Sequence, residues 1–416
     1  MSIRKSFLSA LSLFLFLGFL SAQNTNSPFS RYGFGTLDND NQALGKTRAM
    51  GGIGFGLREK SMINPMNPAS YSAVDTLNLL FDIGFSSTYT KFKENGVSQS
   101  NPNGSFDYVA MKFALKRNWG LAIGLMPYSK VGYSYGTYKE MRNKDGEKIS
   151  YNTTYKGTGG LNTLFLGTGL SLGSDLSLGL NYKYVFGSIA HAGATTSSYS
   201  GFYPESTTEN FYLNASSLDL GVQYQKKFGL KSKAILGAVF SNKSRFTNGE
   251  VSTLVYDGNE TNGDTTNLKF DLPNTMGLGF TYTYDNRLTF GVDYQYQTWG
   301  KSNFLSKKDT LSNNSRISFG VEYLPSVLAT SYFQAIRYRF GMQYSDSYLK
   351  LESGKLKNLG LTFGFGLPLR NQKSMLNIAF EAGKVITPSA ISLSENYYKV
   401  SLDISFNELW FFKTKL

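Results

Sequence analysis

The chain consists largely of runs in which apolar and polar residues alternate with a period of two. Successive side chains of a β-strand point to opposite faces of its sheet, so each run predicts a strand with one apolar and one polar face. The alternation is clearest at 175–187, 218–224, 287–299, 317–323, 336–345 and 400–407. In the first of these runs the apolar face comprises Leu176, Leu178, Leu180, Tyr182, Tyr184 and Phe186.

The composition indicates where these strands reside. Aromatic residues make up 15% of the chain and charged residues 17%, with 43 glycines and only 10 prolines. The mean hydropathy is nevertheless −0.25, a value typical of a water-soluble protein. A transmembrane β-barrel reconciles these values, because only alternate residues face lipid while the others face a polar lumen. A soluble β-sandwich or propeller is the alternative, but it does not account for the density of Tyr and Phe, and the sequence lacks a blade repeat.

Weaker runs bring the expected number of strands to about 14. We predict them at 77–92, 105–117, 119–133, 155–172, 175–190, 211–228, 232–246, 270–284, 286–300, 315–324, 333–346, 358–369, 373–386 and 397–412. The connections after even-numbered strands are mostly short. Those after odd-numbered strands are mostly longer, notably 134–154, 191–210, 247–269 and 301–314. Short turns on one rim and long loops on the other are typical of outer-membrane barrels, so the sequence predicts an all-β, antiparallel transmembrane barrel.

The N-terminus has the three parts of a secretory signal peptide. Arg4 and Lys5 are its positive region, 7–20 its apolar core, and Ser21 and Ala22 the small residues before cleavage. No later stretch approaches the length of a membrane-spanning helix. We therefore expect an exported protein integral to a bacterial outer membrane.

Three regions follow from this prediction. Residues 1–22 are the signal peptide, 23–76 an N-terminal leader and luminal segment, and 77–416 the barrel. Of these, 43–71 is the part most unlike a strand, because it is rich in glycine and carries two Asn-Pro pairs. Glycine allows positive φ and close backbone approach, and Asn-Pro fixes turns. A compact segment of this kind ahead of a barrel predicts a plug that the barrel closes around.

The residue types exclude several functions. The chain has no cysteine and one histidine, His191. A thiol nucleophile, a lipidated cysteine and a multi-histidine metal site are therefore excluded, and we expect neither enzyme activity nor a metal or cofactor. The net charge is +13, but its lysines are scattered, and an exported barrel does not meet nucleic acid. Attraction to the anionic headgroups of outer-membrane lipid and simple solubility are the two interpretations.

A short motif adds a family resemblance. The sequence from Arg48 to Gly54, RAMGGIG, followed by Asn67-Pro68-Ala69, resembles the N-terminal hatch of the FadL/TodX family of outer-membrane transporters for hydrophobic compounds. That resemblance implies a 14-stranded barrel with a hatch in its lumen. The hatch residues it implies are Arg48, Gly51, Gly52, Gly54, Asn67, Pro68 and Ala69. Arg48 is expected to pair with a luminal carboxylate among Asp219, Asp293, Glu322, Glu381 and Asp403, either as structural lining or as a latch.

Pro127 interrupts the third predicted strand, with Gly124 before it. A proline there removes a ladder hydrogen bond and indicates a bulge or an edge. In the FadL/TodX family a break in the third strand opens a lateral passage from the lumen to lipid, so Gly124 and Pro127 are candidates for such an opening. An ordinary bulge near the rim is the alternative.

The leading functional hypothesis is passive uptake of a small hydrophobic compound, such as a fatty acid or hydrocarbon, through the hatch and the lateral opening. The polar composition of 191–210 and 247–269 counts against capture of such ligands. The alternative is a structural or shuttle subunit of an outer-membrane machine for protein secretion or barrel assembly, with other subunits as partners. A constitutively open porin is disfavoured, because 23–76 is available to block the lumen.

Overall fold

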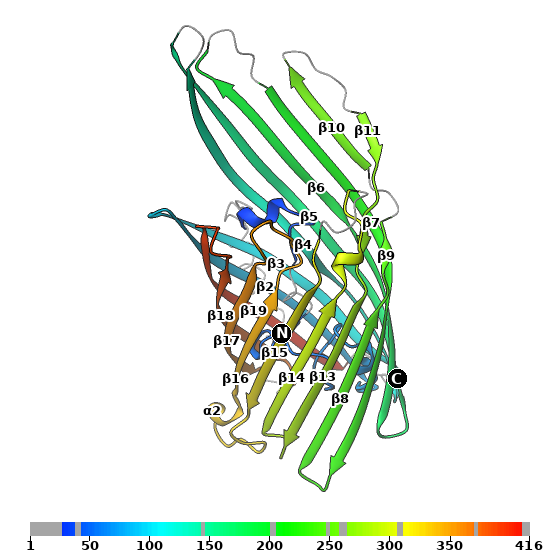
Figure 1. The fold of residues 1–416 in the computed structure, drawn as a ribbon. Helices are drawn as coiled ribbons and strands as arrows, with labels where there is room; N and C mark the ends of the chain where they lie inside the picture. Colours follow the sequence, from blue (N-terminus) through cyan, green and yellow to red (C-terminus); the bar gives the residue numbers. More distant parts are fainter. Residues whose placement is uncertain are drawn as a thin grey trace, which may run out of the picture.

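The computed structural model describes residues 27–37, 43–142, 146–199, 205–246, 250–257, 264–305, 311–369 and 373–409 (Figure 1). The predicted signal peptide at 1–22 and the end of the last predicted strand, 410–412, lie outside the described residues. Within the described ranges, no helix is long and apolar enough to cross a membrane.

Fourteen antiparallel strands form a closed barrel, as the alternation predicts. The first and last barrel strands pair from Asn78↔Leu409 to Lys93↔Ser394, which closes the ring. The barrel strands are β2 (Asn78–Glu94), β3 (Val97–Lys116), β4 (Trp119–Arg142), β5 (Lys148–Leu172), β6 (Leu176–Ser197), β7 (Glu205–Phe228), β8 (Ser232–Ser241), β13 (Thr275–Tyr284), β14 (Leu288–Gln297), β15 (Asn314–Tyr323), β16 (Arg337–Asp346), β17 (Lys357–Pro368), β18 (Met375–Ile386) and β19 (Ser394–Leu409).

The strand faces follow the sequence pattern. In β6, Leu178 and Leu180 are about two-fifths exposed, whereas Ser177 and Asn181 are fully buried. The same outward apolar side chains recur on β7, β13, β14, β16, β17 and β19. The barrel therefore has an apolar exterior suited to lipid and a polar interior.

Five strands are longer than the sequence indicated, and β3 begins at Val97 instead of at residue 105. β4, β5, β6 and β7 extend through most of the predicted loops 134–154 and 191–210, so those loop assignments were wrong. These extensions are polar on both faces, which hides strands from a search for alternation. The predicted loop 247–269 carries two further strands, β10 (Glu250–Asp257) and β11 (Asp264–Asn267). The extended ends of β4–β7, together with β10 and β11, form a sheet that projects beyond the barrel and is called the outer sheet below (Figure 1).

A smaller error concerns the eleventh barrel strand. The residues 333–336 were expected in that strand, but the structure places Tyr332–Ala335 in the short helix α2, and β16 begins at Arg337. The alternation begins only at Ile336, so the preceding residues carry no strand pattern.

Two layers of chain fill the barrel. The luminal segment, residues 43–74, contains the 3₁₀ helices η3 (Gly45–Met50) and η4 (Pro68–Ser72), and nearly all of it is buried. An aromatic layer lies beyond it and includes residues from the N-terminal leader and from loops between strands. Its members are Phe34, Phe246, Phe270, Trp299, Phe304 and Tyr348.

The leader also joins the wall. It contains the 3₁₀ helix η1 (Pro28–Arg31) and the two-residue strand β1 (Thr36–Leu37). β1 pairs with β4 at Lys130 and Ser129. A separate two-stranded sheet, β9 (Ser244–Arg245) with β12 (Asp271–Leu272), lies between the strands β8 and β13 in sequence.

Candidate functional site: the filled lumen and the break in the wall

Arg48 anchors the luminal segment to two strands. Its Nη1 atom lies 2.5 Å from Asp107 Oδ2 on β3, and its Nε atom lies 3.7 Å from Asp403 Oδ1 on β19. All three side chains are almost completely buried. Asp403 was among the partners expected for Arg48, but Asp107, which makes the shorter contact, was not. Ion pairs buried in this way are costly to break, because removal of one partner leaves an uncompensated charge.

The glycines of the luminal segment approach the wall through their backbone. Gly51 N donates to Thr362 Oγ1 at 2.9 Å, and Gly51 O accepts from Arg316 Nη2 at 3.1 Å. A Cβ atom on Gly51 would lie 2.5 Å from Phe319 O, and one on Gly52 would overlap the Arg316 guanidinium. Both glycines have positive φ. The sequence indicated close approach here, and these contacts are the reason for it.

Asp293 on β14 holds the next turn of the luminal segment. Its Oδ2 atom accepts hydrogen bonds from Gly54 N at 2.6 Å and Phe55 N at 2.8 Å. Thr281 Oγ1 donates to Gly56 O at 2.7 Å. The carboxylate thus binds consecutive backbone N–H groups, which is a charge-assisted and therefore strong arrangement.

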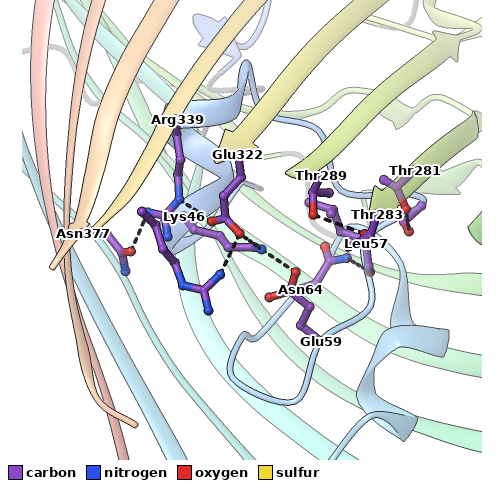
Figure 2. A network of polar contacts seen from close by, with 12 residues as sticks. Lys46, Leu57, Glu59, Asn64, Thr281, Thr283, Thr289, Glu322, Arg339 and Asn377 are labelled. Carbon is purple, nitrogen blue, oxygen red and sulfur yellow. Dashed lines mark hydrogen bonds and ion pairs between the residues drawn. The ribbon is translucent and has the colours of Figure 1, made fainter. Parts of the chain in front are cut away.

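A charged network continues from Lys46 into the wall (Figure 2). Lys46 Nζ lies 2.6 Å from Glu59 Oε1 within the luminal segment and 3.4 Å from Glu322 Oε1 on β15. Glu322 in turn pairs with Arg339 Nε at 2.7 Å, and Arg339 Nη1 donates to Asn377 Oδ1 at 2.7 Å. The network therefore connects the luminal segment to β15, β16 and β18.

Asn67 and Pro68 form a second anchor on the opposite wall. Asn67 Oδ1 accepts from Ala69 N at 3.1 Å and so caps η4. Asn67 Nδ2 donates to Phe55 O at 2.8 Å and to Val222 O of β7 at 3.2 Å. The Asn-Pro pair thus fixes a turn, as expected, and also bonds to the barrel.

Sequence reasoning also missed Lys112, which holds the luminal segment through three hydrogen bonds. Lys112 on β3 is almost fully buried, and its Nζ atom donates to three carbonyl oxygens of that segment. These are Glu59 O at 3.2 Å, Met62 O at 2.5 Å and Ala73 O at 3.0 Å. The polar face of β3 places Lys112 in the lumen, but no pattern in the sequence identifies its three backbone partners.

The aromatic layer is organised around Phe34, which is fully buried. The ring centroid of Phe34 lies 5.5 Å from Phe246, 5.8 Å from Trp299 and 5.1 Å from Phe304. Tyr348 OH donates to Gly35 O at 2.5 Å and so holds the leader against this layer. The leader and the aromatic layer thus close the lumen a second time, beyond the luminal segment.

An acidic side chain lies beside the aromatic layer. Asp271 of β12 is buried, with its Oδ2 atom accepting from Asn303 N at 3.1 Å and lying 3.0 Å from Lys243 Nζ. Burial acts to raise its pKa, but hydrogen bonds from Lys243 and Asn303 outweigh burial and hold the pKa below the usual range of an aspartate. Asp271 is therefore ionised, and its contacts with Arg245 and Asn303 connect the two loops that carry these residues.

The wall is broken beside Pro127. β3 and β4 pair only from Lys116↔Trp119 to Val109↔Leu125. The pairing of β4 with β5 continues along the whole of β4, with a register shift between Pro127 and Ser129. Gly124 of β4 allows the Phe165 ring of β5 to pack against its backbone, because a Cβ atom there would lie 2.6 Å from that ring. Both candidate residues therefore lie where β3 and β4 separate.

Two cavities inside the described part of the barrel are small. A cavity of about 50 Å³ lies between the two layers, beside Met126, Pro127 and Phe55. A second, of about 140 Å³, lies between the leader and the strands β15–β17, and its lining mixes Leu37 and Leu349 with charged groups. A much larger groove, about 1180 Å³, lies at the outer mouth.

His191, the single histidine, is part of an aromatic row. Its Nδ1 atom lies 2.7 Å from Tyr133 OH, and its ring stacks on Tyr133 with the centroids 5.7 Å apart. The structure thus gives His191 a packing environment on the outer sheet. Among the described residues, no cluster of His, Asp and Glu has the arrangement of a metal site.

The fold defines the class: this is a 14-stranded antiparallel β-barrel whose fold is similar to that of solved FadL-type barrels. The CymD monoaromatic hydrocarbon channel superposes with a TM-score of 0.57 at 12% identity, covering 88% of this chain and 98% of that one. The toluene transporter TodX of P. putida gives 0.54 at 14% identity, over 89% and 99%. A FadL homologue from Pseudomonas aeruginosa gives 0.56 at 11% identity, over 88% and 97%.

The chain belongs to the BamG family, whose family model matches residues 2–416. No curated protein matches the sequence. The fold resemblance that the RAMGGIG and Asn-Pro-Ala motifs indicated is thus confirmed.

Proposed function

We propose that this protein is a non-transport, structural subunit of an outer-membrane machine for barrel assembly, exported through its N-terminal signal peptide. The observation that carries the proposal is the double closure of the lumen. The luminal segment bonds to strands around much of the barrel, and the leader that carries Phe34 pairs with the wall at β4. The BamG family match over almost the whole chain supports the same role, because the family name favours the assembly machinery.

Opening such a lumen is energetically demanding. Passage would separate the buried pair Arg48–Asp107, the network at Glu322 and the backbone bonds to Asp293. Breaking one buried ion pair by loss of a partner costs about 3–5 kcal/mol. The 50 Å³ cavity between the layers is also below the ~300–1,000 Å³ of typical ligand pockets. A filled barrel of this kind suits a scaffold better than a conduit.

Passive uptake of a small hydrophobic compound is the second candidate function. The separation of β3 from β4 beside Pro127 favours it, because an opening there would lead from the lumen to lipid. The fold is also shared with CymD and TodX, which are a hydrocarbon channel and a toluene transporter. In this mechanism the residues Gly51, Gly52, Gly54 and Asn67–Ala69 would move as a hatch, with Arg48 as its latch.

One experiment separates the two functions. The protein is extracted from its native outer membrane in a mild detergent, and the material that travels with it is determined by mass spectrometry. Stoichiometric assembly subunits with no small molecule are expected for the proposed function. A lone barrel that carries lipid or hydrocarbon would instead establish transport as the main role.

A further inference from the structure

The outer sheet presents an edge that has no neighbouring strand among the residues that the structure describes. β4 pairs with β5 as far as Arg142↔Lys148, but its pairing with β3 ends at Leu125. Among the described residues, only β1 pairs with the freed side of β4, at Ser129 and Lys130. From Tyr133 to Arg142, alternate backbone N–H and C=O groups of β4 therefore point away from the sheet, which makes this stretch a template for another strand.

The leader shows that this side of β4 accepts added backbone. Besides the β1 pairing, Ser27 N donates to Gly132 O at 3.1 Å, and Gly132 N donates to Ser30 Oγ at 3.1 Å. Among the described residues, the leader covers the edge as far as Gly132. The next residues, Tyr133 to Thr137, continue the same edge and carry no charge. Charged side chains, which protect exposed edges, begin only at Lys139.

A groove runs beside the uncharged part of the edge. It has a volume of about 1180 Å³ and is bounded by β4 from Gly132 to Thr137, by the leader and by the tip of the β2–β3 hairpin. This volume exceeds the ~300–1,000 Å³ of small-molecule pockets, so the groove fits a chain segment better than a single hydrocarbon. Its lining includes the apolar and aromatic side chains of Phe29, Tyr32, Phe92, Tyr133, Tyr135 and Leu351, together with the charged Arg31, Glu94, Lys350 and Glu352.

The edge lies in water rather than lipid. From Gly136 onward all described side chains of β4 are exposed, including the polar Thr137 and Lys139 and the hydroxyl-bearing Tyr138. The neighbouring strand β5 has the same two-sided polar character near Thr153. A strand added here would therefore come from an aqueous partner and not from lipid.

We propose that the Tyr133–Thr137 edge binds an extended segment of another exported polypeptide by β-strand addition. Backbone hydrogen bonds to β4 would supply the affinity, and the aromatic lining would receive apolar side chains at alternate positions of the partner. The preferred partner segment is thus one in which apolar and polar residues alternate. This inference deepens the proposed function, on which it rests, by naming the docking surface and the conformation of the partner.

Disulfide trapping tests the proposal directly, because the chain has no cysteine of its own. The full-length Thr137→Cys variant in detergent is mixed with a cysteine-tagged peptide of residues 397–409, an alternating sequence. The matched control is Thr154→Cys, since Thr154 is also exposed but lies on β5, which is paired on both sides. A second control peptide carries prolines at two central positions, which prevent strand pairing.

Strand addition predicts a trapping yield at least about fivefold higher for Thr137→Cys than for Thr154→Cys, with loss of that excess for the proline peptide. Equal yields at the two positions would overturn the proposal. Preferential disulfide-linked dimers of Thr137→Cys would also overturn it, because the edge would then hold a second copy of this chain.

The extraction experiment separates this inference from the proposed function. If assembly subunits co-purify but residue 137 traps no peptide, the proposed function stands and strand addition at the edge is refuted. Trapping at residue 137 without assembly subunits would refute the proposed function and retain the edge as a peptide-binding surface.

Discussion

Arg48 of the luminal segment and Asp107 of β3 form a fully buried ion pair, 2.5 Å between Nη1 and Oδ2, with Asp403 of β19 as a second neighbour. Replacing Arg48 leaves two carboxylates without their main counter-charge at the centre of the barrel. We expect Arg48→Met to lower the free energy of unfolding by about 3–5 kcal/mol. The measurement is thermal or urea unfolding of the purified barrel in detergent.

The matched control is Lys60→Met. Lys60 also pairs with an aspartate at 2.6 Å, Asp75, but both side chains are well exposed. Exposed pairs contribute about 0–1 kcal/mol, so this variant should unfold nearly as the native protein does. If the two variants behaved alike, Arg48 would not anchor the luminal segment.

Gly51 gives a prediction about backbone approach. Alanine there would place Cβ 2.5 Å from Phe319 O and 2.6 Å from Met342 O, and the residue has a φ of +64°. We expect Gly51→Ala to destabilise the protein by about 2 kcal/mol or more, as strain and overlap add. Gly96→Ala is the control, because Gly96 also has positive φ but no atom within 4 Å of its added Cβ. It should cost only the conformational part, about 1 kcal/mol.

Phe34 is predicted to hold the outer closure. Phe34→Ala would leave a cavity among Phe246, Trp299 and Phe304 and should cost about 3–5 kcal/mol locally. Hydrogen exchange around Phe246 and Trp299 should accelerate while the barrel strands stay protected. Phe333→Ala, which removes an exposed ring on α2, should leave that exchange unchanged. Uniform acceleration over the barrel would show that the aromatic layer is not a separate closure.

Low pH is expected to weaken the contacts that Asp271 makes with Lys243 and Asn303. Its pKa is lower in the folded protein than in the unfolded chain, so its ionised form stabilises the fold above the unfolded value. That contribution is lost as the pH falls from the ordinary aspartate value, about 3.9, through the folded pKa. Hydrogen exchange at the β9–β12 pair should therefore rise at low pH. In Asp271→Asn this pH dependence should disappear, and its persistence would assign the effect to another group.

The sequence predicted the barrel because lipid imposes a strict rule on it. In each pair of consecutive residues, such as Ser177 and Leu178, one side chain faces the lumen and the other faces lipid, and this alternation repeats in every strand of the barrel. The outer sheet escaped prediction because no such rule acts there. The strands near Thr137 and Thr153 face water on both sides, so their sequence shows no alternation of apolar and polar residues.

The sequence predicted the tight backbone turns of the luminal segment, but it did not predict which wall residues contact that segment. Gly51 and Asn67 indicated tight turns because few other residues adopt them. The choice of Asp107 for Arg48, and of three carbonyls for Lys112, depends on how strands distant in sequence face each other across the lumen. That register is set by closure of the whole barrel, and no local pattern encodes it.

Pro127 provides the test that separates the two functions at one residue. Pro127→Ala restores a backbone N–H where β3 and β4 part, so the strands can pair further and narrow the break. If the break serves uptake, cells with this variant should take up labelled toluene more slowly, while outer-membrane protein levels stay normal. If the protein is an assembly subunit, uptake should not change. Pro102→Ala is the control, because Pro102 also lies within a strand, opposite Tyr89 on β2, but seven residues from Val109, where the pairing of β3 with β4 ends. Equal slowing by both variants would show that the position of Pro127 has no special role.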